Sequence, residues 1–270
     1  MQINLIFAAG SLMLASMGVL LTELSGCLCI AAEGFMVLGA FFCYVFTLWT
    51  GSAFAGVFFS AVLCALIGLA LIVFIQKCKA DPFVAALALN LGSLGITSTL
   101  SQTLFGTSGV LHEISFNSGQ RFMFVIAAVF FLILTAIFLA SPYGKRLKAV
   151  GRSVPAAIQI GIHTDRYIVA SWVLCAFFAA VAGASVVFRA GVYAPLGIAG
   201  RGWLAIAAVY LGFKNIFGLC ASTFFLALVE QIAYNAQKIS SLNVTAILGL
   251  PSFLALVLYA ISQRKKHKLS

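Results

Sequence analysis

Residues 53–75 read AFAGVFFSAVLCALIGLALIVFI and contain no charged side chain. A helix of about 20 apolar residues crosses a hydrocarbon core of roughly 30 Å, so this stretch predicts a membrane span. The whole chain has the same character, since 63% of its residues are hydrophobic and 8% are charged, against roughly a quarter charged in soluble domains. Continuous rather than alternating apolar runs favour helices over a barrel. The composition therefore predicts an all-α integral membrane protein.

Eight or nine spans are expected in one membrane domain that covers residues 1–270. The first apolar segment lacks the positively charged start of a secretory signal, so it is expected to be a retained span. The expected segments are 3–22, 31–49, 53–75, 82–104, 121–140, 166–188, 201–213, 215–236 and 244–262.

The net charge of +10 is explained better by membrane topology than by nucleic-acid binding, because the basic residues lie in short connections between spans. We expect membrane lipid, and no nucleic acid, as a partner. If the connection at 141–165 is cytoplasmic, so are Lys77, Lys79, Lys214 and the basic tail at 264–268. The positive-inside rule then places the N-terminus outside and the C-terminus in the cytoplasm. The basic residues left on the far side are Arg121, Arg189, Arg201 and Lys238.

Motifs for hydrolytic or metal chemistry are absent from the sequence. The seven cysteines lie mostly in apolar segments, and their spacing matches no disulfide framework or zinc site. We expect them to be small packing residues, with no metal bound. No GxxxxGK[ST] phosphate loop and no HExxH pair occurs, so the chain is not expected to hydrolyse ATP or to be an intramembrane enzyme.

Two segments interrupt the apolar pattern and are similar to each other. Residues 23–34 carry two glutamates and two glycines, and residues 201–213 are short for a span. In each, a charged residue, a glycine and an aromatic residue precede apolar and small residues: Glu33, Gly34 and Phe35 in the first, Arg201, Gly202 and Trp203 in the second. Paired interruptions are typical of inverted repeats, with one broken or short helix per half and the substrate path between them. A chance match is the alternative.

The charged and aromatic members of these segments have two interpretations each. Glu33 and Arg201 are expected to hold the broken helices, by pairing with each other or with backbone, and substrate contact is the alternative. Phe35 and Trp203 could stack on a flat heterocycle, whereas ordinary packing is the default among 25 phenylalanines.

Polar residues inside the spans are candidates for a substrate path. Asn90, Ser93, Thr97 and Ser101 are spaced by three, four and four and thus share one helix face. This face could bind a passing solute or join packed helices.

Glu230 and Tyr234, four residues apart, are a second candidate pair for the path. A carboxylate at the bilayer centre costs about 2.5 to 3.5 kcal/mol, so a deep Glu230 should face a cavity or a partner. Contact with water near the outer surface is the alternative.

The connection at 141–165 concentrates positive charge within eight positions. Ser141 and Pro142 are expected to end the preceding span. The basic residues that follow are Lys145, Arg146, Lys148 and Arg152.

A short helix is expected next, over Pro155–Ile160. Ser153 is a suitable N-cap, Pro155 suits the first turn, and Gly161 suits the C-terminal stop. Its apolar residues are Ala156, Ala157, Ile158 and Ile160. Exposed apolar residues on a small helix favour a docked partner, and anchoring by charge alone is the alternative.

The stretch GKRLKAVGRSVPAAIQIGI at 144–162 resembles the cytoplasmic coupling loop of bacterial ABC importer permeases for sugars, branched-chain amino acids and nucleosides. Four further stretches agree, and the one at 88–106 is similar to the second permease of nucleoside-type importers, a branch that includes spirochaete riboflavin importers. They are LSGCLCIAAEGFMVLGAF at 24–41, ALNLGSLGITSTLSQTLFG at 88–106, AAVAGA at 179–184 and AGRGWLAIAAVYLG at 199–212. Cys29, where the family commonly has Asn, and LGFKNIFG, which lacks the usual proline, depart from the pattern.

The resemblance implies a permease subunit of an inner-membrane importer for a nucleoside-like aromatic solute. It implies a separate ATPase that binds ATP and Mg, a second homologous permease and a substrate-binding lipoprotein or periplasmic protein. Pro155 to Gly161 would couple to the ATPase, and the four basic residues before them would hold the loop at the inner face or contact the acidic rim of the ATPase. His112 and Glu113, in an outer loop, could meet the binding protein. The alternatives are an ion-coupled secondary transporter with Glu230 as proton carrier, or an ABC permease for a sugar or branched-chain amino acid.

Overall fold

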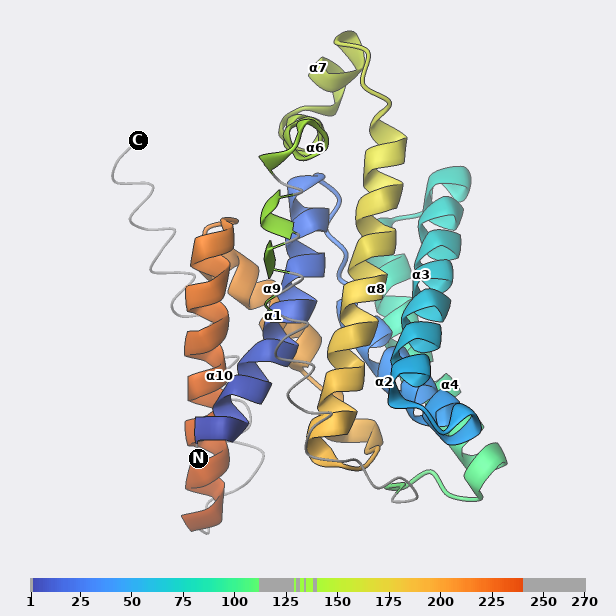
Figure 1. The fold of residues 1–270 in the computed structure, drawn as a ribbon. Helices are drawn as coiled ribbons and strands as arrows, with labels where there is room; N and C mark the ends of the chain where they lie inside the picture. Colours follow the sequence, from blue (N-terminus) through green and yellow to red (C-terminus); the bar gives the residue numbers. More distant parts are fainter. Residues whose placement is uncertain (1, 112–128, 130–131, 134, 138–139, 240–270) are drawn as a thin grey trace.

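The computed structural model describes residues 2–111, 129, 132–133, 135–137 and 140–239. Five helices in this part are long and apolar enough to span a membrane. They are α1 (Gln2–Leu24), α2 (Ala32–Thr50), α3 (Ala53–Cys78), α4 (Pro82–Phe105) and α8 (Thr164–Ala190). The chain therefore forms a multi-pass helical bundle (Figure 1).

Five shorter or later helical elements also lie in the described part of the bundle. They are α6 (Pro142–Arg152), α7 (Val154–Gln159), the 3-10 helix η1 (Pro195–Ile198), α9 (Arg201–Leu211) and α10 (Ile216–Ile239). The expected spans at 3–22, 31–49, 53–75, 82–104 and 166–188 correspond to the five long helices. The segment at 121–140 lies largely, and that at 244–262 wholly, outside the described residues.

The core of the bundle is built where α8 packs against α1 and α2, at positions with small side chains. A Cβ atom at Gly183 of α8 would lie 2.0 Å from the carbonyl oxygen of Met36, and one at Gly39 would lie 2.3 Å from Cα of Ala180. Membrane helices gain stability from such close backbone approach, because lipid provides no hydrophobic drive for helix association. The glycines at these crossings therefore set the spacing of the central helices.

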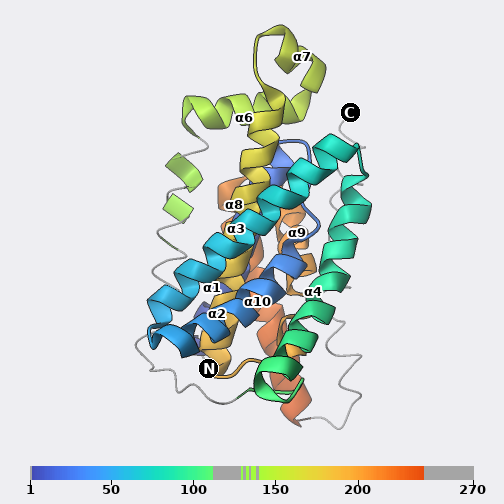
Figure 2. The same ribbon diagram turned by 90° about the vertical axis from the view of Figure 1, so that its right-hand side faces the viewer.

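One end of the bundle, here called the basic end, carries α6 and α7. Helices α1 and α3 end there, α8 begins there, and α6 runs across the bundle in Figure 2. Lys77 and Lys79, at the end of α3, and the four basic residues of α6 are exposed at this end. The opposite end holds the isolated bridge between Leu111 and Tyr193.

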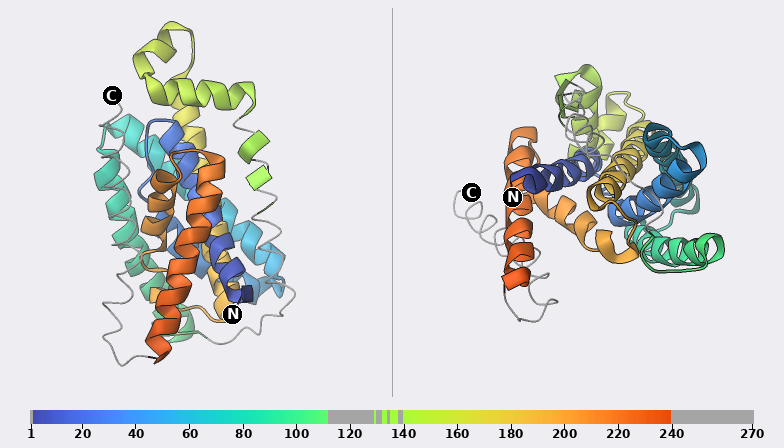
Figure 3. Two further views of the ribbon diagram at one scale, coloured as in Figure 1. Left: turned by 90° about the vertical axis from the view of Figure 1, so that its left-hand side faces the viewer. Right: turned by 60° about the horizontal axis from the view of Figure 1, so that its bottom comes forward.

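Helix α9 runs from the interior of the bundle toward the basic end, and α10 returns beside α1 (Figures 1 and 3). Arg201, expected among the basic residues on the far side of the membrane, is not an exposed loop residue. Arg201 starts α9 and is 9% exposed, because its side chain points into the bundle toward α1 and α10.

Gly183→Ala is expected to destabilise the protein by about 1 to 3 kcal/mol, the usual cost of overpacking. The matched control is Gly92→Ala in α4, where an added Cβ meets nothing within 4 Å. This control should leave the melting temperature unchanged or raise it, since alanine favours helix over glycine. Thermal unfolding in detergent checks both, and equal shifts for the two variants would contradict the assigned crossing.

Candidate translocation site and coupling helices

The N-termini of α2 and α9 meet inside the bundle. The backbone N–H of Gly200, the N-cap of α9, donates to Oε1 of Glu33 at 2.9 Å. A Cβ at Gly202 would lie 2.5 Å from Cα of Glu33, so only glycine permits this approach. The two similar sequence segments are thus in direct contact, and Glu33 binds α9 backbone rather than the Arg201 side chain.

Asn90 of α4 forms hydrogen bonds with backbone groups at the start of α2. Its Oδ1 accepts from the N–H of Gly34 at 2.8 Å, and its Nδ2 donates to the carbonyl of Ile30 at 3.1 Å. Free backbone groups at a helix start need partners when water is excluded. Asn90 therefore joins α4 to α2 in this conformation.

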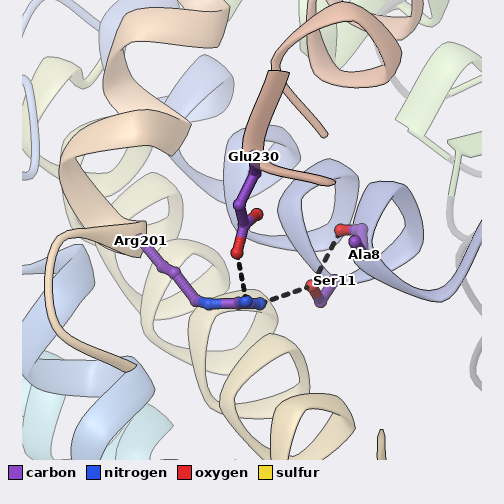
Figure 4. Close-up of polar contacts among 4 residues, drawn as sticks. All are labelled: Ala8, Ser11, Arg201 and Glu230. Carbon is purple, nitrogen blue, oxygen red and sulfur yellow. Dashed lines mark hydrogen bonds and ion pairs between the residues drawn. The ribbon is translucent and has the colours of Figure 1, made fainter. Parts of the chain in front are cut away.

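Arg201 pairs with Glu230 of α10 and also donates to Oγ of Ser11 in α1 at 3.4 Å (Figure 4). The side chains of Arg201 and Glu230 are 10% and 26% exposed. A deep Glu230 was expected to need a cavity or a partner, and Arg201 is that partner. The ion pair links three helices at the inner end of α9.

The charges around this site are close to balance. Two carboxylates, Glu33 and Glu230, face one guanidinium and the N-termini of two helices. Each helix N-terminus carries the equivalent of about half a positive charge. A neutral polar solute suits such a site better than a strongly charged one.

The expected stripe on α4 is buried within the protein. Ser93, Thr97 and Ser101 are at most 1% exposed, and their hydroxyls donate to the backbone carbonyls of Asn90, Ser93 and Thr107. Each hydroxyl is thus satisfied without a solute. The stripe packs as one face, and its role in a path stays a prediction.

The aromatic candidates differ from one another in exposure. Phe35 is fully buried in the core and offers no face for stacking in this conformation, whereas Trp203 is 45% exposed. The side chain of Tyr234, together with His112 and Glu113, lies outside the described residues.

Two helices form the connection at the basic end. Ser141 and Pro142, which were expected to end the preceding span, begin α6, since the Ser141 hydroxyl accepts from the N–H of Gly144 at 3.4 Å and caps this helix. The basic residues Lys145, Arg146, Lys148 and Arg152 are all exposed on α6. The sequence pattern did not indicate this helix.

The short helix α7 is confirmed with a shift of one residue. Ser153 caps it through the N–H of Ala156, and Gly161 follows it with a φ of +77°. Ala157 is 1% exposed, while Val154, Ile158 and Ile160 are 40%, 58% and 70% exposed. Ala157 is therefore the buried side chain of this helix, and the large apolar side chains face outward.

Sequence reasoning missed a polar cluster at the basic end. Glu23, at the end of α1, contacts Tyr210 and Lys214 at the end of α9. The available signal was a pair of opposite charges at the borders of two apolar runs. Ser11 was also missed, because a lone serine in a span carries no such signal.

These features define the chain as a multi-pass helical membrane protein. A family model described as "Branched-chain amino acid transport system / permease component" matches residues 1–260. The chain belongs to this family.

Relatives of known description share about a quarter of the sequence. The nucleoside ABC transporter permease protein NupC of Lactococcus lactis is 26% identical over 89% of this chain and 84% of its own length. The guanosine ABC transporter permease protein NupQ of Bacillus subtilis is 25% identical over 85% and 80%. A putative glucose ABC transporter permease of Haloferax volcanii is 25% identical over 86% and 76%.

A solved structure shares the fold at low identity. PsaBC from Streptococcus pneumoniae, in complex with a Fab, superposes with a TM-score of 0.60 over 97% of this chain and 90% of that chain, at 13% identity. The chain therefore shares its fold with this solved structure.

Removing one member of the buried ion pair should be costly. Arg201→Met and Glu230→Gln are each expected to destabilise the protein by about 3 to 5 kcal/mol, because each leaves a group without its partner. The double variant should recover much of the loss. Melting temperatures of the four proteins in detergent check this cycle, and strictly additive single effects would show that the two side chains do not interact.

Proposed function

We propose that this chain is the permease subunit of an ATP-driven importer, which moves a nucleoside-like aromatic solute by alternating access coupled to a separate ATPase. The observation that carries the proposal is α7, a capped helix with exposed Val154, Ile158 and Ile160 at the basic end of a permease-family bundle. Large apolar side chains on a protruding helix need a covering partner. With no phosphate loop in the chain, the ATP and Mg site belongs to that partner.

The substrate assignment rests on the relatives named for nucleoside and guanosine. A purine nucleoside or riboflavin, each a flat heterocycle with a polyhydroxyl arm, fits a near-neutral polar site beside a half-exposed Trp203. A sugar remains an alternative substrate because one relative is named for glucose. A branched-chain amino acid remains another because the family is described by that substrate.

The partners and location follow from the same assignment. The basic end would lie in the cytoplasm of a bacterium, where α7 meets the ATPase and the cations of α6 face its acidic rim or the membrane surface. The C-terminus would lie on the same side. A second, homologous permease and a substrate-binding lipoprotein or periplasmic protein would complete the importer.

An ion-coupled transporter is disfavoured by one contact. Glu230, the candidate proton carrier, is instead engaged in an ion pair with Arg201 that joins α10 to the start of α9. Uptake should therefore need ATP and the ATPase, and it should survive an ionophore that collapses the proton gradient.

Ile158→Asp is expected to lower ATPase binding by more than about tenfold, since it places a charge in an apolar contact. Membrane insertion should be unchanged because Ile158 is 58% exposed. Copurification with the ATPase and uptake of labelled guanosine or riboflavin into proteoliposomes, with the binding protein present, measure the effect.

Gln159→Ala, at the neighbouring exposed position of α7, is the matched control and should behave like the parent. Normal ATPase binding by Ile158→Asp would contradict the role of α7. Strong uptake by the permease alone would overturn the proposal as a whole.

A further inference from the structure

Glu23 joins the ends of α1 and α9 at the basic end. Its Oε2 accepts from the hydroxyl of Tyr210 at 2.9 Å, and its Oε1 lies 2.5 Å from Nζ of Lys214. The Lys214 ammonium also lies 5.4 Å from the centre of the Tyr210 ring. The Glu23 side chain is 12% exposed and that of Lys214 is 48% exposed, so the carboxylate of this pair is largely removed from water.

The turn that carries Lys214 is strained. Phe213 and Lys214 have φ values of +54° and +58°, a region that side chains other than glycine rarely adopt. Gly212 and Gly218 make the turn tight, since a Cβ at Gly218 would lie 2.1 Å from the Gly212 carbonyl oxygen. Such strain persists only where the surroundings hold the backbone, and Glu23 holds Lys214.

A second contact attaches the other end of α9 to the same helix. Arg201, the first residue of α9, donates to Ser11 of α1. Ser11 and Glu23 thus hold α9 at both ends, side by side with the half of α1 that leads to the basic end.

Helix α6 rests on the end of α1 by direct backbone contact. A Cβ at Gly151 would lie 2.2 Å from the carbonyl oxygen of Leu24, and one at Gly26 would lie 3.0 Å from Cα of Gly151. Leu24 directly follows Glu23. No side chain separates the two backbones. A shift of α6 toward α1 therefore cannot be absorbed by side-chain rearrangement between them.

We propose that Glu23 is a positioning residue that makes α6, α1 and α9 move as one body when α7 is displaced. The displacement then reaches Arg201 and Gly200 at the inner end of α9, next to Glu33. This inference rests on the proposed coupling role of α7. The competing route runs through α8 alone, which begins at Thr164 shortly after α7.

The first test uses two substitutions in the same strained turn. Phe213→Gly and Lys214→Gly both relieve a positive φ, but only Lys214→Gly removes the contact with Glu23. Solute taken up per ATP hydrolysed should fall about fivefold or more for Lys214→Gly and Glu23→Gln, the lower bound of typical coupling between sites. ATPase binding should stay unchanged. Phe213→Gly and the charge-conserving Lys214→Arg should stay near the parent value.

The second test replaces the ion pair with a reversible covalent link. E23C/K214C is treated with a short bifunctional methanethiosulfonate, in a background where Cys27, Cys78 and Cys220, the thiols that are not buried, are serine. If the helices move as one body, linking restores the uptake per ATP that the untreated variant has lost, and a reductant removes the gain. Each single cysteine variant, treated in parallel, controls for modification alone.

The outcomes separate the two proposals. A linked protein whose uptake per ATP stays low, or falls further, would show that Glu23 and Lys214 must part during transport and would overturn the inference. Normal coupling in Lys214→Gly and Glu23→Gln would assign the route to α8. Absence of ATP-dependent uptake in the parent complex would instead overturn the proposed function.

Discussion

Two helices of this protein begin inside the bundle, and the need to satisfy their first backbone N–H groups constrains the rest of the fold. Water and lipid offer no partners there, so side chains from other helices must supply them. Glu33 does so for α9 through Gly200, and Asn90 does so for α2 through Gly34. Because these partners come from α2 and α4, the two helix starts are satisfied only when α2, α4 and α9 are assembled together.

This constraint explains where the sequence was informative and where it was not. Continuous apolar runs predict the long helices, and the similarity between Glu33-Gly34 and Arg201-Gly202 marks the two interior helix starts. The choice of partners depends on tertiary packing. Glu33 binds the backbone beside Arg201, while Arg201 reaches Glu230, which lies 29 residues further along the chain. No local pattern distinguishes that arrangement from a direct Glu33–Arg201 pair.

At the basic end, rules that depend on neighbouring residues predicted α7 but not α6. The cap at Ser153 and the stop at Gly161 were predictable because capping depends on adjacent residues. Helix α6 was not expected, since its cluster of cations hides an apolar face formed by Leu147 and Val150, which pack on the bundle. The contact of Gly151 with Leu24 is likewise a property of two backbones that are distant in sequence. From the sequence alone, Gly151 is typical of a loop, and its role in the contact between α6 and α1 is evident only from the structure.

The length of α9 has a consequence for how the protein enters the membrane. Its 11 residues extend about 16 Å, half the thickness of the hydrocarbon core, and its inner end carries a cation. Alone in lipid during synthesis, this segment would be too short to span the hydrocarbon core and would carry an unpaired charge into it. The counter-charge arrives only with α10, so the insertion machinery must retain α9 until the whole hairpin has emerged and can partition as a unit.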